Sequence, residues 1–314
     1  MDLLTQGLLG AVVALSGAKR SLKGTVEIKM AAGIGFFAGL LADVDILIRS
    51  SSDTLLSIEY HRHFTHSLLF IPVGAFIAAL LLWPVLRNKL VFKRIYYYSL
   101  LGYLLSGLLD ACTSYGTHLL LPFSQQRVAW HVISIIDPIF TLALFIAMVL
   151  AVRKKSFFAA RLGLGFCFCY LAFGTLQLQR AESMLASIAQ SRGHVMQRHI
   201  VKPTLANVFL WRSVYIHDAT LYTDAINIGL FSAGKHYAGK SSPLLVLEDE
   251  FPGLNKSSVL YQDLKRFEHF SDGYLAFHPR DKNIIGDARY SILPNGINPL
   301  WGIEIDREHP DQHA

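Results

Sequence analysis

The sequence predicts an α-helical polytopic membrane domain of about six spans, followed by a small α+β soluble domain. Of its 314 residues, 52% are apolar and only 17% are charged, whereas a soluble domain usually carries about 25% charged residues. The charge is also uneven. Residues 1–176 hold 15 Lys and Arg against 8 Asp and Glu, while residues 177–314 hold 14 against 15. We therefore place the domain boundary between residues 176 and 177.

Six apolar runs make up the predicted membrane domain. They cover approximately residues 4–18, 30–48, 66–86, 96–117, 132–152 and 157–176, and a crossing helix needs about 20 residues. The first run follows an acidic start and has no signal-peptide cleavage pattern, so we expect it to stay as a membrane helix. Its Gly7, Gly10 and Gly17 favour close packing against a neighbouring helix.

The connections between these runs predict the orientation. They carry four, two, four, one and four Lys and Arg residues in turn, and positive loops stay in the cytoplasm. The N-terminus and residues 177–314 are then outside, in a multi-pass protein of the inner membrane whose C-terminal domain is periplasmic. Because the basic excess lies in these loops, the expected partner is the lipid bilayer and no nucleic acid is expected.

Residues 177–314 show the pattern of a small mixed domain. A helical pattern at 177–192 precedes alternating runs typical of an antiparallel sheet. The stretch "HDAT" at 217–220 predicts a hairpin connection between two strands. A further helix is predicted near 258–270.

Ionisable residues within or beside the apolar runs are candidates for function, because charge is costly in a membrane. On the predicted topology all of them face the outer side: Asp43, Asp45, His61, His63, His66, Asp110, His118, His131 and Asp137. Carboxylates combined with imidazoles suit a divalent cation such as zinc or manganese. Such a cation lowers the pKa of bound water and makes it a nucleophile.

Residue spacing gives local expectations for this outer layer. Asp110 shares a helix face with Ser106 and Ser114, which lie four residues away on either side. Asp43 and Asp45 are two residues apart, about 200° around an α-helix. Both can face one site only if the helix ends or distorts there.

The stretch "HRHFTHS" at 61–67 leads into the third run. We expect His61 on the loop and His66 in the first helical turn, with Thr65 as the N-cap. Arg62 is a candidate partner for an anionic substrate, or for a structural ion pair with Asp43 or Asp45.

Several alternatives remain open from the residues alone. A serine nucleophile could be assembled from Ser67 or Ser114, although no nucleophile-elbow sequence surrounds either. Cys112, Cys167 and Cys169 lie in or beside apolar runs and are predicted to pack as small apolar residues. The ionisable cluster could also serve a transporter or proton relay, or act structurally in a non-catalytic envelope protein.

The chain resembles the YdjM-like family of bacterial inner-membrane proteins, which are assigned as metal-dependent hydrolases. The resemblance rests on "LLADVDIL", "HRHFTHSLLF", "LLDACTSYGTHLLLPFS" and "IIDPIFTL", and it continues into the C-terminal part. It implies a membrane-bound hydrolase that uses a metal. A lipid-linked or phosphate-ester substrate is expected from the position of the cluster at the outer membrane interface, and not from the resemblance. The implied metal ligands are His61, His66, Asp43 and Asp110, and the implied catalytic residues are Arg62, Asp45 and Asp137.

The chain departs from the family pattern at four positions. The family often has His where this chain has Gln6 and Ser106, and it usually has Pro at Ala42 and Gly at His63. The departures make His63 and His118 alternative ligands. Thr65 is carried over with the "HRHFTHS" motif.

Overall fold

The computed structural model describes residues 1–18 and 25–314. Contacts divide the chain into two units, each of which is treated by itself. The first comprises Met1–Leu47, Tyr60–Thr175 and Leu205–Asn207, and the second comprises Ile48–Glu59, Leu176–Thr204 and Val208–Ala314. Of the first predicted connection, Lys19, Arg20 and Lys23 lie outside the described residues, whereas Lys29 lies in the next helix.

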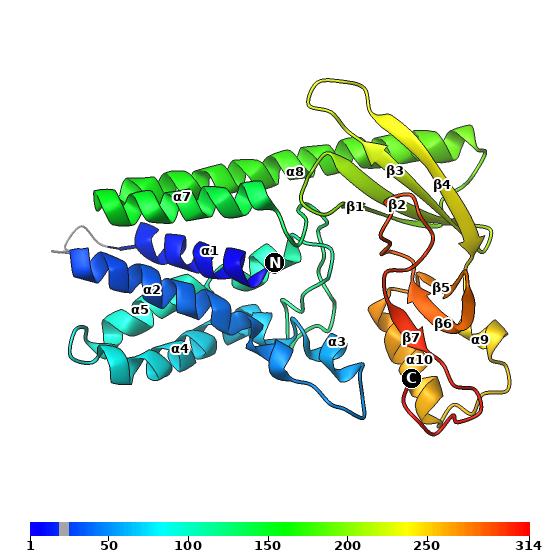
Figure 1. The fold of residues 1–314 in the computed structure, drawn as a ribbon, viewed down its shortest axis with the longest axis horizontal. Coiled ribbons are helices and arrows are strands. Elements are labelled where there is room, and N and C mark those ends of the chain that lie inside the picture. The colour runs from blue at the N-terminus through cyan, green and yellow to red at the C-terminus, as the bar shows by residue number, and fades with distance from the viewer. Residues whose placement is uncertain (19–24) are drawn as a thin grey trace. The chain divides into compact units, whose positions relative to one another are not determined.

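Helices form the first unit (Figure 1). Their bounds are α1 Leu3–Ser16, α2 Thr25–Leu41, η1 Ala42–Leu47, α3 Leu56–Tyr60, η2 Phe64–His66, η3 Leu68–Phe70, α4 Ile71–Leu86, α5 Phe92–Tyr103, α6 Ser106–Ala111, α7 Pro138–Lys154 and α8 Phe157–Ser191, where η marks a 3-10 helix. Of these, α3 lies almost entirely in the second unit, and α8 continues into it. Helix α1 packs against α2, α5 and α7, and α4 packs against α2 and α5. These helices bury a core of Leu, Val, Ile and Ala side chains.

The prediction of about six spans is not supported. Three helical segments of the described residues are long and apolar enough to cross a membrane: Glu27–Leu47, Leu68–Leu86 and Phe157–Ser191. Helix α1 is apolar but has only 14 residues. Several of the apolar runs in the sequence are therefore longer than the continuous helices that they form.

Two of the predicted spans are shortened for identifiable reasons. The run 96–117 is divided between α5 and α6 and then leaves the helix after Ala111. In the run 132–152, helix α7 begins only at Pro138 and has 17 residues. Proline disfavours the helical conformation in the residue before it, and Asp137 is extended and caps α7 instead.

Glycines let α1, α2 and α5 approach closely, as predicted for Gly10. A Cβ atom on Gly10 would lie 2.9 Å from the carbonyl oxygen of Gly102 and would also meet the carbonyl oxygen of Gly35. A Cβ atom on Gly35 would lie 2.5 Å from the Cβ of Ala14. Backbone meets backbone at this crossing, so no side-chain movement can make room.

Gly35→Ala should therefore destabilise the first unit by about 1–3 kcal/mol, the usual range for overpacking a tight interface. The matched control is Gly33→Ala in the same helix, because a Cβ on Gly33 meets nothing within 4 Å among the described residues. Thermal unfolding of the full chain in detergent compares the two variants. Equal midpoints would contradict the close approach.

The second unit contains two antiparallel sheets. One has the order β1-β2-β3-β4 and the other the order β5-β6-β7. The strands are β1 Arg198–Pro203, β2 Leu210–His217, β3 Thr220–Asn227, β4 Lys235–Pro243, β5 Leu275–His278, β6 Asp281–Asp287 and β7 Gly302–Glu304. The predicted hairpin is confirmed, because β2 pairs with β3 through a turn at Asp218 and Ala219, both with positive φ.

Helices flank these sheets. The short α9 spans Leu247–Glu250, and α10 at Val259–Phe270 confirms the helix predicted near 258–270. The predicted span at 157–176 and helix at 177–192 are one continuous helix, α8, of 35 residues. At 1.5 Å per residue this is about 52 Å, longer than the hydrocarbon of a bilayer.

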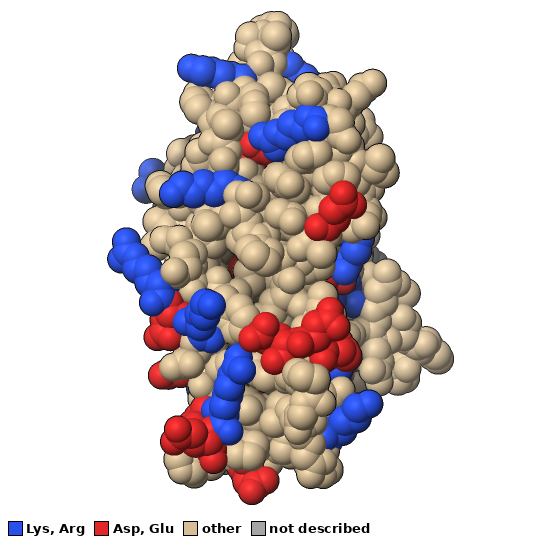
Figure 2. All heavy atoms as spheres, turned by 90° about the vertical axis from the view of Figure 1, so that its right-hand side faces the viewer, with Lys and Arg blue, Asp and Glu red and all other residues tan. Residues whose placement is uncertain are grey.

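Charged side chains of both signs are interspersed on the face drawn in Figure 2. Several of the exposed charges of the second unit form ion pairs, for example Arg307 with Glu250 at 3.2 Å. This pattern agrees with the near-neutral balance of residues 177–314. The second unit therefore has the charge pattern of a surface in contact with water.

Candidate metal centre

The end of α2 carries the first two candidate residues. The α-helix changes to the 3-10 helix η1 at Ala42, and η1 contains Asp43 and Asp45. Both are buried, at 4% and 1% exposure. The predicted distortion is present, and it lets two carboxylates two residues apart face the same cluster.

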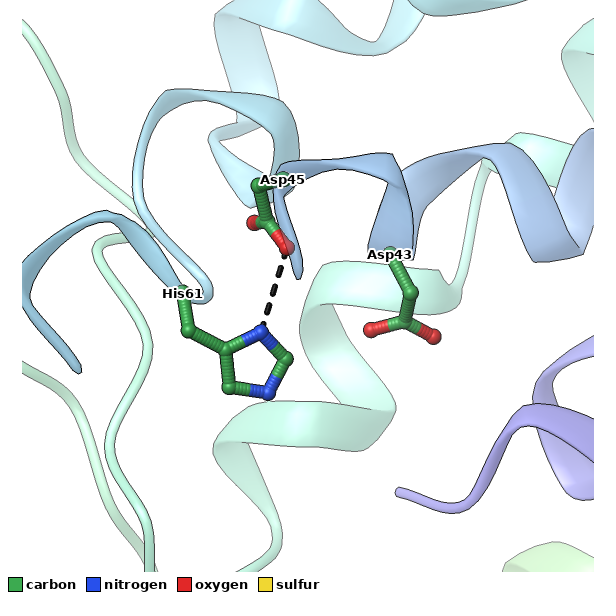
Figure 3. Close-up of side chains that lie close together, drawn as sticks. All are labelled: Asp43, Asp45 and His61. Atoms are coloured by element: carbon green, nitrogen blue, oxygen red, sulfur yellow. Dashed lines mark hydrogen bonds and ion pairs between the residues drawn. The ribbon is translucent and has the colours of Figure 1, made fainter. Parts of the chain in front are cut away.

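Asp45 holds the following segment in place. Its Oδ2 accepts hydrogen bonds from the backbone N–H of Arg62 at 2.8 Å and from the hydroxyl of Thr65 at 2.6 Å. Its Oδ1 lies 3.1 Å from Nδ1 of His61 (Figure 3). Nδ1 of His66 lies 3.3 Å from Oδ2. One carboxylate therefore orients two imidazoles, the arrangement that commonly supports metal-binding histidines.

His66 turns its other ring nitrogen toward two further carboxylates. Its Nε2 lies 3.3 Å from Oδ1 of Asp43 and 2.9 Å from Oδ2 of Asp110. Ligand atoms about 2.1 Å from one cation lie about 3.0–3.4 Å apart for bond angles between octahedral and tetrahedral values. One ligand atom from each of Asp43, His66 and Asp110 lies within 4.8 Å of the others. This buried group has the donor set and spacing of a divalent-cation site.

The electrostatics of the group favour positive charge. His66 lies before the candidate span that begins at Leu68. Burial lowers the pKa of His66, but Asp110, Asp43 and Asp45 outweigh burial and raise that pKa to about 10. The carboxylates thus stabilise a cation at this position.

A second group shares Asp43 with the first. Asp43, Asp45 and His61 each place one ligand atom within 4.8 Å of the others. Figure 3 shows their side chains facing a common region from η1 and from the turn after α3. The His61 side chain is 20% exposed, so this group reaches the surface.

Arg62 contacts the cluster on the side of Asp110. Its guanidinium lies 3.3 Å from Oδ1 of Asp110, donates to the hydroxyl of Thr113 at 2.8 Å and packs over the ring of Tyr115. The backbone of Arg62 has a φ of 60°, which is unfavourable for a bulky residue. The amino group of Met1 also contacts Oδ1 of Asp110. The alternative ion pairs of Arg62 with Asp43 or Asp45 do not form.

Asp137 lies outside both groups. Its Oδ1 accepts hydrogen bonds from the backbone N–H groups of Ile139 and Phe140 at the start of α7. Its Oδ2 accepts one from the hydroxyl of Tyr170 at 2.8 Å. The carboxylate is thus a helix cap, and a catalytic role for Asp137 stays a prediction.

His63 and His118 lie beside the cluster. Their rings pack edge to face with centroids 4.8 Å apart. Neither belongs to the groups of possible ligands found among the described residues. His131 is likewise in none of these groups.

Other expectations for the segment need correction. Thr65 is not an N-cap: η2 begins after His63, and the hydroxyl of Thr65 bonds Asp45 instead. His66 ends η2 rather than starting a long helix. Ser67 donates its hydroxyl to the carbonyl oxygen of Phe64. α6 ends at Ala111, so the expected helix face does not extend to Ser114.

Gln6 and Ser106 occupy the two positions at which the resemblance implies histidines, and these two residues are in contact in this chain. Nε2 of Gln6 donates to the carbonyl oxygen of Ser106 at 3.3 Å, and both residues are buried. Oε1 of Gln6 accepts no hydrogen bond from the described residues. Because the two residues are 100 positions apart, the sequence alone could not predict this contact.

A family sequence model described as YdjM inner membrane protein matches residues 1–181. The chain belongs to this family. The match covers every residue of the two groups and ends before the first strand, so the chain is an inner membrane protein whose family-defining part contains the cluster. Comparisons with curated proteins and with solved structures found no match. Membership of the YdjM family supports a location in the membrane. The family description names no reaction.

A third group of possible ligands, which the sequence pattern did not indicate, lies in the second unit. Asp53, Asp263 and His313 could together offer ligand atoms within 4.8 Å of one another. Arg266 already bonds Asp53 and Asp263, and it bonds Glu59 as well. The carboxylates raise the pKa of Arg266 above its usual value. This group is an ion-pair network centred on one arginine, and residues so distant in sequence gave no signal of it.

Proposed function

We propose that this protein is a membrane-bound metal-dependent hydrolase whose cation, zinc or manganese, is held by Asp43, His66 and Asp110. The observation that carries the proposal is the convergence of three buried ligand atoms from three separate segments. The residues fit a metal, since carboxylate oxygens and imidazole nitrogen are its usual donors. When bound, such a cation supplies Lewis-acid chemistry and an activated water.

The surrounding residues have separable roles. Asp45 fixes the orientation of His66 through Nδ1 and leaves Nε2 for the cation. Through its Oδ2 we therefore assign Asp45 a positioning role toward the first cation, in place of the implied catalytic one. It also fixes the backbone of Arg62.

Arg62 supports an anionic substrate. Its side chain is 1% exposed, and Nε has no hydrogen-bond partner among the described residues. A buried N–H of this kind costs free energy unless it is paired. A phosphate oxygen of a phosphate ester, free or lipid-linked, would satisfy it. A substrate of this class suits a site at the edge of a membrane helix.

Metal analysis of the full chain tests the proposal. After purification in detergent with divalent cations present, wild type should retain bound metal. His66→Ala should lose most of it, because the affinity lost with a ligand exceeds the about 10–100-fold typical of an outer-shell partner. If wild type holds no metal, the proposal of a metal-dependent hydrolase is contradicted, and a structural or proton-relay role of the cluster is favoured.

His63→Ala is the matched control, since His63 lies three residues away in neither group. It should retain metal. Loss of metal from His63→Ala would make His63 a ligand, and retention by His66→Ala would refute the proposed donor set. Turnover of phosphate esters by the metal-loaded protein then tests hydrolysis itself.

We also propose that the C-terminal domain is periplasmic. Arg153, Lys154, Lys155 and Arg161 surround the start of α8, the last candidate span. Positive residues beside a span stay in the cytoplasm, which directs the far end of α8 outward. A reporter active only outside the cytoplasm, fused after Ala314, should be active. Activity of a cytoplasm-specific reporter at that position would refute this orientation.

A further inference from the structure

We propose that the cluster holds a second divalent cation, bound by Asp43, Asp45 and His61, so that Asp43 bridges two cations. The proposal rests on the metal centre proposed above and defines its chemistry further. Two groups of possible ligands share Asp43 and no other residue. The shared carboxylate is what turns two neighbouring groups into one centre.

The two oxygens of Asp43 are free to serve different cations. Oδ1 lies 3.3 Å from Nε2 of His66, in the first group. Oδ2 accepts no hydrogen bond from any described residue, although Asp43 is only 4% exposed. An unpaired oxygen of a buried carboxylate is costly. A cation between Asp43 and the second group would satisfy it.

The two oxygens of Asp45 are likewise divided. Oδ2 faces three donors, the backbone N–H of Arg62, the hydroxyl of Thr65 and Nδ1 of His66. Oδ1 faces His61, at 3.1 Å from Nδ1. That distance is within the about 3.0–3.4 Å expected between two ligands of one cation. A cation there would replace the proton shared by Asp45 and His61.

The two sites differ in access to solvent. The side chains of His66 and Asp110 are fully buried, whereas that of His61 is 20% exposed. The second cation should therefore exchange faster and leave first when a chelator is added.

A pair of cations narrows the substrate class. Two divalent cations about 3.5–4 Å apart clamp both the attacking and the leaving oxygen of an in-line displacement at phosphorus. Arg62, on the Asp110 side of the cluster, adds positive charge for a further phosphate oxygen. The centre is thus suited to hydrolysis of a phosphate ester. In that reaction the water oxygen bonds to phosphorus and the water gives up a proton, the bond from phosphorus to the ester oxygen breaks, and the ester oxygen takes up a proton.

Manganese is the probe that tests the second site. The full chain in detergent is equilibrated with Mn²⁺, freed of excess metal and measured for bound manganese per chain and for its electron paramagnetic resonance spectrum. Wild type should hold two ions with the spectrum of a coupled pair. His61→Ala should hold one ion with the spectrum of isolated manganese. His63→Ala, the matched control, should behave as wild type.

The outcomes separate the two proposals. One ion in both wild type and His61→Ala overturns the second site and leaves the first standing. No ion in wild type overturns the proposed function itself, and the second site falls with it. If His61→Ala loses both ions, His61→Gln and the elution volume distinguish misfolding from shared ligation. Loss of both ions from a folded His61→Gln also overturns a separate second site.

Discussion

Asp43→Asn should abolish stoichiometric metal binding and reduce hydrolysis to background. Asp43 contributes a ligand atom to both groups, and the amide keeps the shape of the side chain while removing its charge. The loss in metal affinity should exceed the about 10–100-fold seen when an outer-shell partner of a metal site is removed. Metal content of the purified full chain measures it directly.

Asp137→Asn is the control for this change. Asp137 is also fully buried in the first unit, but its carboxylate caps α7. Asparagine is itself a good N-cap, so the variant should fold and keep its metal. Equal metal loss from the two variants would mean that general destabilisation, and not ligation, explains the result for Asp43→Asn.

The convergence of the candidate residues could be predicted because charge is rare in the apolar runs. Asp43, His66 and Asp110 lie at the ends of separate runs, and a common polar layer is the least costly place for them. The detailed roles could not be predicted in this way. The turn after α3 determines which donors contact each oxygen of Asp45. The spacing of residues in the sequence does not predict the conformation of that turn.

The helix boundaries show a similar limit. Hydropathy located the apolar runs well, but it does not register where a helix stops. The division of 96–117 between α5 and α6 falls at Leu104 and Leu105, two apolar residues that give no signal of a helix end. In the second unit the local signals were stronger. The turn at Asp218 and the N-cap at Ser258 are short-range features, and both elements were predicted correctly.

In the second unit, Asp224→Asn should lower the free energy of unfolding by about 2 kcal/mol, which is below the range for fully buried pairs because Arg192 is partly exposed. Asp224 is fully buried on β3 and accepts two bonds from the guanidinium of Arg192, at 2.7 and 2.8 Å. It also accepts from Nε2 of His236 and from the backbone N–H of Gly239. One carboxylate thus joins the end of α8 and strand β4 to strand β3.

The pH dependence of the effect identifies the charge as its cause. Burial alone would raise the pKa of Asp224, but the bonds from Arg192, His236 and Gly239 lower it below the ordinary 3.8. A carboxyl group whose pKa is lower in the folded state stabilises that state fully above 3.8, and the contribution is lost as the pH falls through the folded pKa. The difference in free energy of unfolding between wild type and Asp224→Asn should therefore become smaller as the pH falls from 3.8 through the folded pKa of Asp224.

Hydrogen exchange of β2 and β3 peptides in the full chain in detergent measures the local stability. Asp272→Asn provides the matched comparison, because the Asp272–Arg198 pair spans 2.9 Å but both side chains are about half exposed or more. An exposed pair contributes at most about 1 kcal/mol, so this variant should exchange nearly as wild type does. Equal effects at both positions would show that burial of the Asp224 carboxylate adds nothing. A difference that persists unchanged below the folded pKa would show that side-chain shape, and not charge, stabilises the sheet.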